Sequence, residues 1–302
     1  MMSSMTPDKP AVDHHTHVFS PQSNALLASR INRSLPPITV TELLGVLDRD
    51  EITKAAVLSA AYFFARPGND DAAAVAAEND YLAAEISKHR DRLAGFLSIN
   101  PLCASSAAEI DRCASMPEFV GLKLHLANSE VDLRDVSHVT RLAERFEHAN
   151  ARGLVILVHM RTQQPEYGRP DAEIFIERVL PKASSVPVQI AHMAGWGGYD
   201  DATDGALGAF VDVVAGGGHD NLHFDISAAV LPAGVEKRGL PKQHPERLAG
   251  RIHQIGCKRV LFGTDWPEWT PRRYTKDLSN LPLGDDELGA IIANRAPWTE
   301  KS

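Results

Sequence analysis

The chain has 302 residues, of which 44% are hydrophobic and 23% charged, with 31 Lys and Arg against 39 Asp and Glu and a formal net charge of −8. This composition argues against disorder, and the lack of any basic run argues against nucleic acid or an anionic membrane surface as a partner. The apolar runs are far shorter than the roughly 20 residues of a membrane span. The three scattered cysteines, which form no CxxC pair, favour a reducing cytoplasm. Residues 1–11 are expected to be a disordered lead-in, not a signal peptide.

Short apolar, β-branched runs alternate with longer amphipathic stretches along the chain. These runs predict strands at 12–18, 55–59, 93–99, 119–124, 154–159, 188–192, 222–226 and 260–263. The clearest helical patterns lie at 71–89, 135–152, 171–180 and 245–255. Eight strands alternating with helices, without a linker to divide them, predict an α/β chain with a single (β/α)8 TIM barrel over 12–302. A doubly wound open sheet is the alternative, but no GxGxxG follows the first strand.

Two long connections interrupt this alternation. The first spans 19–39 and contains Pro21, Pro36 and Pro37. The second spans 227–244 and contains Pro232, Gly234, Gly239 and Pro241. Loops of this length in a barrel commonly border the substrate, so both connections are candidates for the pocket rim.

The first predicted strand carries three histidines in the sequence VDHHTH. Because side chains alternate along a strand, Asp13, His15 and His17 are expected on one face, with His14 and Thr16 on the other. Imidazole is a common metal ligand, and two imidazoles two residues apart can converge on one cation. Taken alone, the pair is equally compatible with a histidine-rich, solvent-exposed N-terminus.

Three further polar residues end later strands. His159 closes the run LVILV, His192 closes VPVQIA, and Asp265 follows VLFG. In a barrel these strand ends all lie on one face, where barrel enzymes assemble their active sites. The histidines and Asp265 are therefore expected to share one site, in which Asp265 supplies a hard oxygen ligand or a base.

These motifs resemble the amidohydrolase superfamily. VDHHTH, then ILVHM and IAHMAGWGG around the two later histidines, then FGTDWP occur in the superfamily's order from Val12 to about Trp266, and DELGAIIANRA resembles its closing helix. HxH alone is a weak signal, whereas HxH, His, His and Asp in this order is a strong one. More narrowly, the motifs resemble the amidohydrolase-related branch, which includes aminocarboxymuconate-semialdehyde decarboxylase and the pyrone-dicarboxylate lactonase type.

The resemblance implies a metal-dependent enzyme with one divalent ion, usually zinc. It implies that His15, His17, His159 and Asp265 bind the ion, and that His192 polarises the water on it. Zinc with an open coordination position lowers the pKa of its water to about 7, so elementary chemistry agrees with this donor set. His192 or Asp265 would accept the proton as the water attacks a carbonyl, which makes them the candidate catalytic residues.

The fourth predicted strand, EFVGLKLHL, adds polar groups to the same mouth. Lys123 either binds a substrate carboxylate or, as in some superfamily members, carries a carbamate that bridges two metal ions. His125 is a candidate substrate-orienting donor. Arg161 is a candidate anion clamp or a solvated loop charge. These three are the candidate substrate-binding residues.

Other residues have two interpretations. His223 and Asp225 share a face of the seventh predicted strand, where pocket and core packing are both compatible with the pattern. Trp196, Trp266 and Trp269 follow candidate strands, and they either wall the pocket or cover the core.

The expected activity is hydrolysis of a C–N or C–O bond in an amide, lactam or lactone, within a small molecule that can carry a carboxylate. A metal-dependent non-oxidative decarboxylase is the nearest alternative, because the resembled branch includes that chemistry with the same ligands. A lactonase type with a dispensable metal and a catalytically silent, ligand-binding barrel are further alternatives. The expected partner is a small-molecule substrate, and a homo-oligomer stays open.

Overall fold

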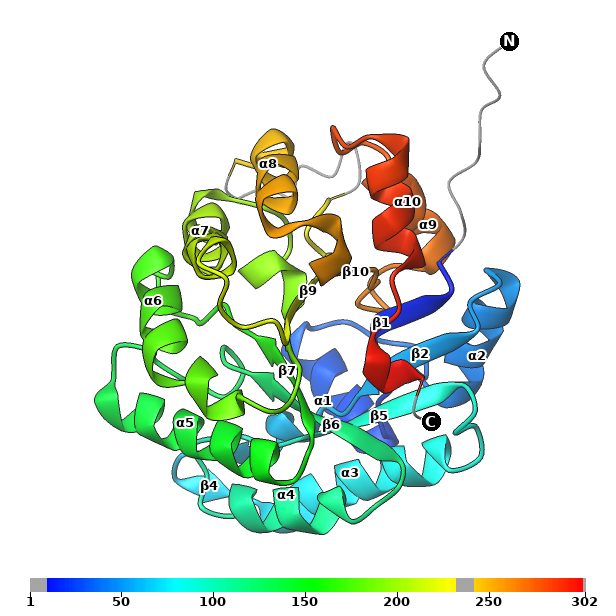
Figure 1. The fold of residues 1–302 in the computed structure, drawn as a ribbon. Coiled ribbons are helices and arrows are strands. Elements are labelled where there is room, and N and C mark those ends of the chain that lie inside the picture. The colour runs from blue at the N-terminus through cyan, green and yellow to red at the C-terminus, as the bar shows by residue number, and fades with distance from the viewer. Residues whose placement is uncertain (1–9, 232–241, 301–302) are drawn as a thin grey trace.

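The computed structural model describes residues 10–231 and 242–300. The expected lead-in up to residue 9, and Pro232, Gly234, Gly239 and Pro241 of the second long connection, lie outside the described residues. One parallel sheet runs in the order β1-β2-β5-β6-β7-β8-β9-β10, and Figure 1 shows helices arranged around it. The sheet closes where His14 N donates to Phe262 O at 3.0 Å and Asp265 N donates to His15 O at 2.8 Å. The fold is a single (β/α)8 TIM barrel.

All eight predicted strands are confirmed. They are β1 Val12–His17, β2 Lys54–Leu58, β5 Leu93–Ser98, β6 Phe119–His125, β7 Val155–His159, β8 Val188–Ile190, β9 Leu222–Asp225 and β10 Val260–Leu261. Strands of a parallel barrel are covered on both faces, so they appear in the sequence as continuous apolar runs. A short antiparallel pair, β3 Ala65–Arg66 with β4 Asn69–Asp70, follows β2 and was not expected from the pattern.

Ten α-helices lie within the described part of the chain. They are α1 Pro21–Arg30, α2 Val40–Arg49, α3 Ala72–Ile86, α4 Ser106–Ala114, α5 Val136–Ala151, α6 Arg169–Arg178, α7 Asp201–Ala215, α8 Pro245–Ile255, α9 Pro271–Leu278 and α10 Asp285–Ala293. Within residues 10–231 and 242–300, every helix is too short or too polar to cross a lipid bilayer.

The first long connection, 19–39, is not an irregular loop throughout, because α1 occupies its first half. The helix begins with two strong start signals. The Ser20 hydroxyl accepts a hydrogen bond from Ser23 N at 3.1 Å, and Pro21 occupies the first helical position, where its missing N–H costs nothing. The prolines that suggested a loop therefore include one that starts a helix.

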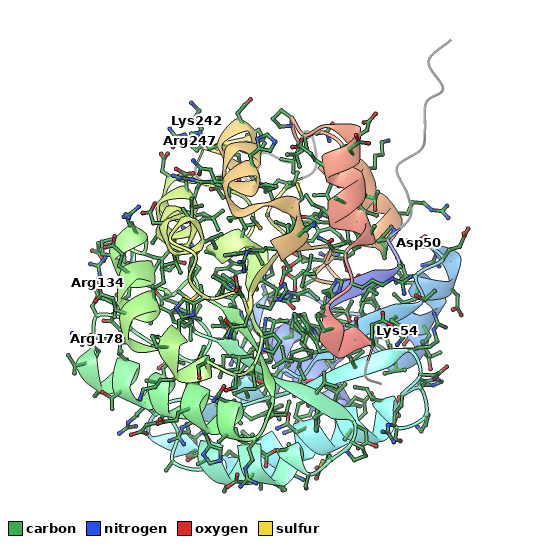
Figure 2. All side chains as sticks on the ribbon, viewed as in Figure 1. Asp50, Lys54, Arg134, Arg178, Lys242 and Arg247 are labelled. Atoms are coloured by element: carbon green, nitrogen blue, oxygen red, sulfur yellow. The ribbon has the colours of Figure 1, made fainter. Side chains whose placement is uncertain are left out.

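Part of the barrel interior is an apolar cluster, and polar side chains gather at its carboxyl end. Ala56, Leu58, Phe96, Val155, Leu157 and Leu261 pack together with Ala296 and Trp298, and these last two belong to a segment that closes the amino end. Gly121 leaves room for Phe96, because a Cβ there would lie 2.3 Å from the Phe96 ring. Charged side chains such as Arg134, Arg178 and Arg247 stand at the outer edge of the helical ring (Figure 2).

Strand β1 departs from simple alternation. Its pairing with β2 shifts register between Asp13 and Thr16. The His14 ring reaches the segment that closes the amino end, where Nε2 accepts from Ala296 N at 3.1 Å and Nδ1 donates to Phe262 O at 2.9 Å. The expectation that His14 and His15 lie on opposite faces of the strand is therefore wrong, because both rings lie in the barrel interior, next to the shift in register.

Candidate active site

The candidate ligands from the two ends of the chain meet at the carboxyl end of the barrel. Nε2 of His15 lies 3.4 Å, and Nε2 of His17 lies 3.3 Å, from the same carboxylate oxygen of Asp265. One ligand atom from each of the three residues lies within 4.8 Å of the others, a geometry that could hold a metal ion. Imidazole nitrogens and a carboxylate oxygen are the ligands that zinc takes in catalytic sites.

Burial sets the protonation of these ligands. It lowers the pKa of His15 to about 3, and it lowers the pKa of His17 against the opposing effect of Asp265. Burial alone would raise the pKa of Asp265, but the hydrogen bond with His17 and the neighbouring histidines hold it well below its usual range. At neutral pH the site therefore presents neutral imidazoles and an ionised carboxylate, which are the forms that bind a cation.

His159 lies on the other side of the site. Its ring stacks on His125 at 3.9 Å and lies 5.1 Å from the His192 ring, so the structure brings it to the site but not into the three-residue group with Asp265. Both of its ring nitrogens are buried without a hydrogen-bond partner among the described residues. Because an unpaired buried nitrogen is costly, this ring is suited to receive an added ligand, and the donor set fits a divalent ion.

His192 reaches the site through an unusual backbone turn. Strand β8 ends at Ile190, two residues before the predicted end, and a short helical turn, η3 (Ala191–Ala194), follows. His192, Met193 and Ala194 have φ values of 56°, 52° and 67°. Left-handed conformations cost non-glycine residues of the order of 1–3 kcal/mol each, so three in succession indicate that the surroundings hold the turn. The turn places the His192 ring 4.6 Å from the His15 ring.

Lys123 and His125 come from β6. Lys123 is 1% exposed, and its Nζ lies 3.4 Å from Nε2 of His15. Burial lowers its pKa to about 8. Within the described residues, no carboxylate lies within ion-pair distance of this amine. His125 is covered by aromatic rings, with Tyr62 at 5.0 Å and Trp196 at 6.4 Å.

The three tryptophans divide between the two interpretations. Trp196 is 54% exposed and stands edge-on to His159 at 5.6 Å, so it walls the site. Trp266 is buried and pairs with Thr16 beside the closing seam of the barrel. Trp269 packs at 5.7 Å against Tyr274, on the helical layer.

Arg161 is not a solvated loop charge. Its Nη1 donates to Asp200 Oδ2 at 2.8 Å and to Thr203 Oγ1 at 3.2 Å, at the start of α7. The guanidinium also lies 5.8 Å from the Tyr167 ring. The structure therefore ties Arg161 to the rim of the barrel, where an ion pair with a mostly buried carboxylate sets its position.

Sequence reasoning noted Asp225 but gave it no role. This carboxylate is fully buried, and its Oδ2 accepts from His15 Nδ1 at 3.0 Å and from Gln189 Nε2 at 2.7 Å. It also forms a second possible metal group with His15 and His192. Its position near the end of a strand, like that of the histidines, was the available signal. Its neighbour His223 is a packing residue, 5.3 Å from Trp298.

Comparisons with known proteins identify the family and the fold. The amidohydrolase family model matches residues 12–293. A solved structure of 5-carboxyvanillate decarboxylase from Sphingomonas paucimobilis is 18% identical in sequence, with a TM-score of 0.62. The alignment covers 95% of this chain and 97% of the decarboxylase chain. A probable 2-pyrone-4,6-dicarboxylic acid hydrolase from Acinetobacter baumannii is 16% identical, with a TM-score of 0.60 and coverages of 93% and 96%.

A third similar structure is 2,6-dihydroxybenzoate decarboxylase from Rhizobium, 16% identical, with a TM-score of 0.61 and coverages of 95% and 97%. The comparison with curated protein sequences finds no match. At these identities the solved structures establish the shared fold, and they include both hydrolases and decarboxylases. The family model, in contrast, spans nearly the whole barrel with the site residues inside the match, and the chain therefore belongs to the amidohydrolase family.

Proposed function

We propose that this protein is a metal-dependent hydrolase that opens a C–N or C–O bond of a small, carboxylate-bearing amide, lactam or lactone. One observation carries the proposal: Nε2 of His15 and Nε2 of His17 converge on a single oxygen of Asp265, at 3.4 and 3.3 Å. We propose that these residues and His159 hold one divalent ion, with zinc as the first ion to test. The neutral rings and ionised carboxylate support this assignment.

A bound divalent ion supplies Lewis-acid polarisation of a carbonyl and lowers the pKa of water to about 7. His192 is the proposed general base. Its Nδ1 lies 2.9 Å from the Ser227 carbonyl oxygen, which can only accept, so Nδ1 carries the proton and Nε2 has the lone pair. As water adds to the carbonyl carbon, its proton passes to Nε2 of His192 and then to the leaving nitrogen or oxygen when that bond breaks. Asp265 is the second candidate proton acceptor.

Lys123 supports a substrate that carries a carboxylate. An amine that is 1% exposed and lacks a carboxylate within ion-pair distance, among residues the structure describes, is a costly arrangement. A substrate carboxylate would supply the missing charge. We propose that His125 orients the substrate from the same strand and that Arg161 contributes from the rim, through guanidinium donors other than the Nη1 that binds Asp200.

The test measures bound metal and activity together. Elemental analysis of the purified protein is expected to find one divalent ion per chain, and a variant with both His15→Ala and His17→Ala is expected to lose it along with activity. His253→Ala is the matched control, because this exposed histidine binds Glu287 on the outside of the barrel. Hydrolysis of lactones, lactams and amides at an undiminished rate by metal-depleted protein would overturn the proposal.

The same panel distinguishes the alternatives. Two similar solved structures are decarboxylases, so unsaturated and aromatic carboxylates belong in the panel with carbon dioxide release as the readout. Metal-dependent carbon dioxide release without hydrolysis would assign the decarboxylase alternative. Absence of any turnover, with a melting temperature that neither chelation nor zinc changes, would favour a silent binding barrel.

A further inference from the structure

We propose that Asp225 is a positioning residue that sets the tautomer of His15 and supports that of His192 through Ser227, so that both rings direct an Nε2 lone pair into the site. This inference rests on the proposed function, since it concerns how two of its residues are prepared. Asp225 belongs to β9 and is fully buried, while His15 lies on β1 and His192 follows β8. No other carboxylate in the described parts of the chain contacts groups of both histidines.

The carboxylate acts only as an acceptor. Its Oδ2 accepts from Gln189 Nε2 at 2.7 Å, and its Oδ1 accepts from the backbone N–H groups of His192 at 3.1 Å and Ser227 at 3.2 Å. The Ser227 hydroxyl also donates to Oδ1. Amide groups can only donate in these contacts, so this environment is built for an ionised carboxylate.

His15 therefore has one tautomer available. Its Nδ1 lies 3.0 Å from Asp225 Oδ2, and since the carboxylate accepts, Nδ1 must carry the proton. A neutral imidazole has only one N–H, so Nε2 has the lone pair. That nitrogen lies on the side of Asp265 and Lys123, each at 3.4 Å.

The same carboxylate supports the His192 tautomer through the Ser227 hydroxyl. The Ser227 hydroxyl donates its one hydrogen to Asp225. Its oxygen, 2.9 Å from Nδ1 of His192, can therefore only accept a hydrogen bond from that nitrogen. The Ser227 carbonyl oxygen, also 2.9 Å from Nδ1, accepts as well. Both contacts require a proton on Nδ1 and leave Nε2 unprotonated. Asp225 also holds the His192 N–H, at the first residue of the left-handed turn.

A purely structural role makes a different prediction. If Asp225 only satisfied buried donors, its loss would lower stability and leave the ring tautomers unchanged. If it positions the rings, its loss also changes the His15 tautomer and weakens ion binding, since partners that orient metal-binding histidines typically contribute about 10–100-fold in affinity or activity.

The first measurement uses the metal-free, full-length wild-type chain. Nitrogen-15 NMR of the histidine side chains separates Nδ1–H from Nε2–H tautomers, and His15→Gln and His192→Gln variants identify the two signals among the 13 histidines. Both rings are expected to be Nδ1–H tautomers. An Nε2–H tautomer at either ring would overturn the inference. This measurement needs no variant of Asp225, so it holds even if such a variant fails to fold.

The second measurement compares variants by zinc affinity, in competition with a chromophoric chelator. Asp225→Asn is expected to bind zinc about 10–100-fold more weakly and to lose the single Nδ1–H signal of His15. Ser227→Ala is expected to keep the His15 tautomer, and also that of His192, because the backbone carbonyl of residue 227 still accepts from Nδ1. The control is Asp171→Asn, which removes another fully buried carboxylate that contacts Arg134 and Gly168 instead.

The outcomes separate the two proposals. Wild-type zinc affinity in the Asp225→Asn variant, or an equal loss in the Asp171→Asn control, would overturn the positioning role. Failure of the wild-type chain to bind zinc would instead contradict the proposed function, while the tautomer measurement on metal-free protein would still test the positioning role.

Discussion

Nζ of Lys123 lies 3.4 Å from Nε2 of His15, in the interior of the barrel. A protonated Lys123 amine repels any cation that binds to Nε2 of His15, so it weakens cation binding there. A substrate anion, in contrast, is attracted both by the amine and by a bound cation. The lowered pKa of Lys123, about 8, reflects its burial. This position would link occupancy of the proposed substrate site to the charge of the proposed metal site.

Replacing this amine should therefore raise the affinity for the metal ion and lower the affinity for the substrate. The Lys123→Met variant is expected to bind zinc more tightly than the wild type. Its KM for carboxylate-bearing substrates is expected to rise about ten- to a hundredfold, because a lost hydrogen bond to a charged group costs roughly 1.5–3 kcal/mol. Isothermal titration and steady-state kinetics measure both. A fall from two bound ions to one would instead indicate that Lys123 carries a bridging carbamate.

Chelation should destabilise the protein. An ion that binds only the folded chain stabilises it by RT ln(1 + [L]/Kd), about 4 kcal/mol when the free ion is at a thousand times Kd. The melting temperature of the wild-type protein is expected to fall by several degrees with chelator and to recover with zinc. A variant with His15→Ala and His17→Ala should show neither response, and a wild-type melting temperature indifferent to chelator contradicts the metal assignment.

Gly121 should not tolerate even a methyl group. A Cβ at this position would lie 2.3 Å from the Phe96 ring and 2.6 Å from the Val155 carbonyl oxygen, which is backbone and cannot turn away. Gly121→Ala is expected to lower the free energy of unfolding by about 1–3 kcal/mol, the usual cost of overpacking. Since Lys123 follows on the same strand, activity should fall as well.

Gly45 provides the matched control for that substitution. It lies within α2, and a Cβ there would meet nothing within 4 Å. Gly45→Ala should be neutral or stabilising by up to about 1 kcal/mol, because alanine favours a helix interior. Urea denaturation of both variants checks the pair, and equal effects would show that the packing argument fails.

Acid should destabilise the fold through His223. Burial, with a smaller effect of Arg259, lowers its pKa to about 4, against about 6.5 in an unfolded chain. Between these values the unfolded chain binds a proton that the folded chain does not, so the free energy of unfolding falls as the pH falls from 6.5 to 4.

The size of this effect can be measured by substitution. At pH 5 the His223 contribution is at most about 2 kcal/mol, from 1.36 kcal/mol per pKa unit. His223→Gln is expected to lose less stability than wild type between pH 7 and pH 5 in urea denaturation. The same slope in the His223→Gln variant and in the wild type would contradict the burial argument.

The sequence predicts the barrel and the location of the site because both depend on local patterns. Buried parallel strands appear as apolar runs, and residues at the ends of those runs share one face, which brings His15, His17 and Asp265 together without knowledge of any other contact. The segment that forms α1 was predicted less well, because a proline is equally typical of a loop and of the first position of a helix.

Other features depend on contacts between distant segments. The left-handed turn at His192 contains no glycine that would signal it, and it is held partly by Asp225, 33 residues later. The contact between Asp225 and His15 spans 210 residues. The pairing of Arg161 with Asp200 likewise depends on how α7 packs, so Asp200 could not be identified from spacing as the partner of Arg161.

The segment that closes the amino end of the barrel has a consequence for assembly. His14 near the start of the chain obtains its Nε2 partner from Ala296, 282 residues later, and Trp298 covers the interior beside it. Contacts of such long sequence separation form late and slow folding. The interior beside His14 is therefore covered only when a segment 282 residues further along the chain docks, so we expect this contact to contribute to slow folding of the barrel.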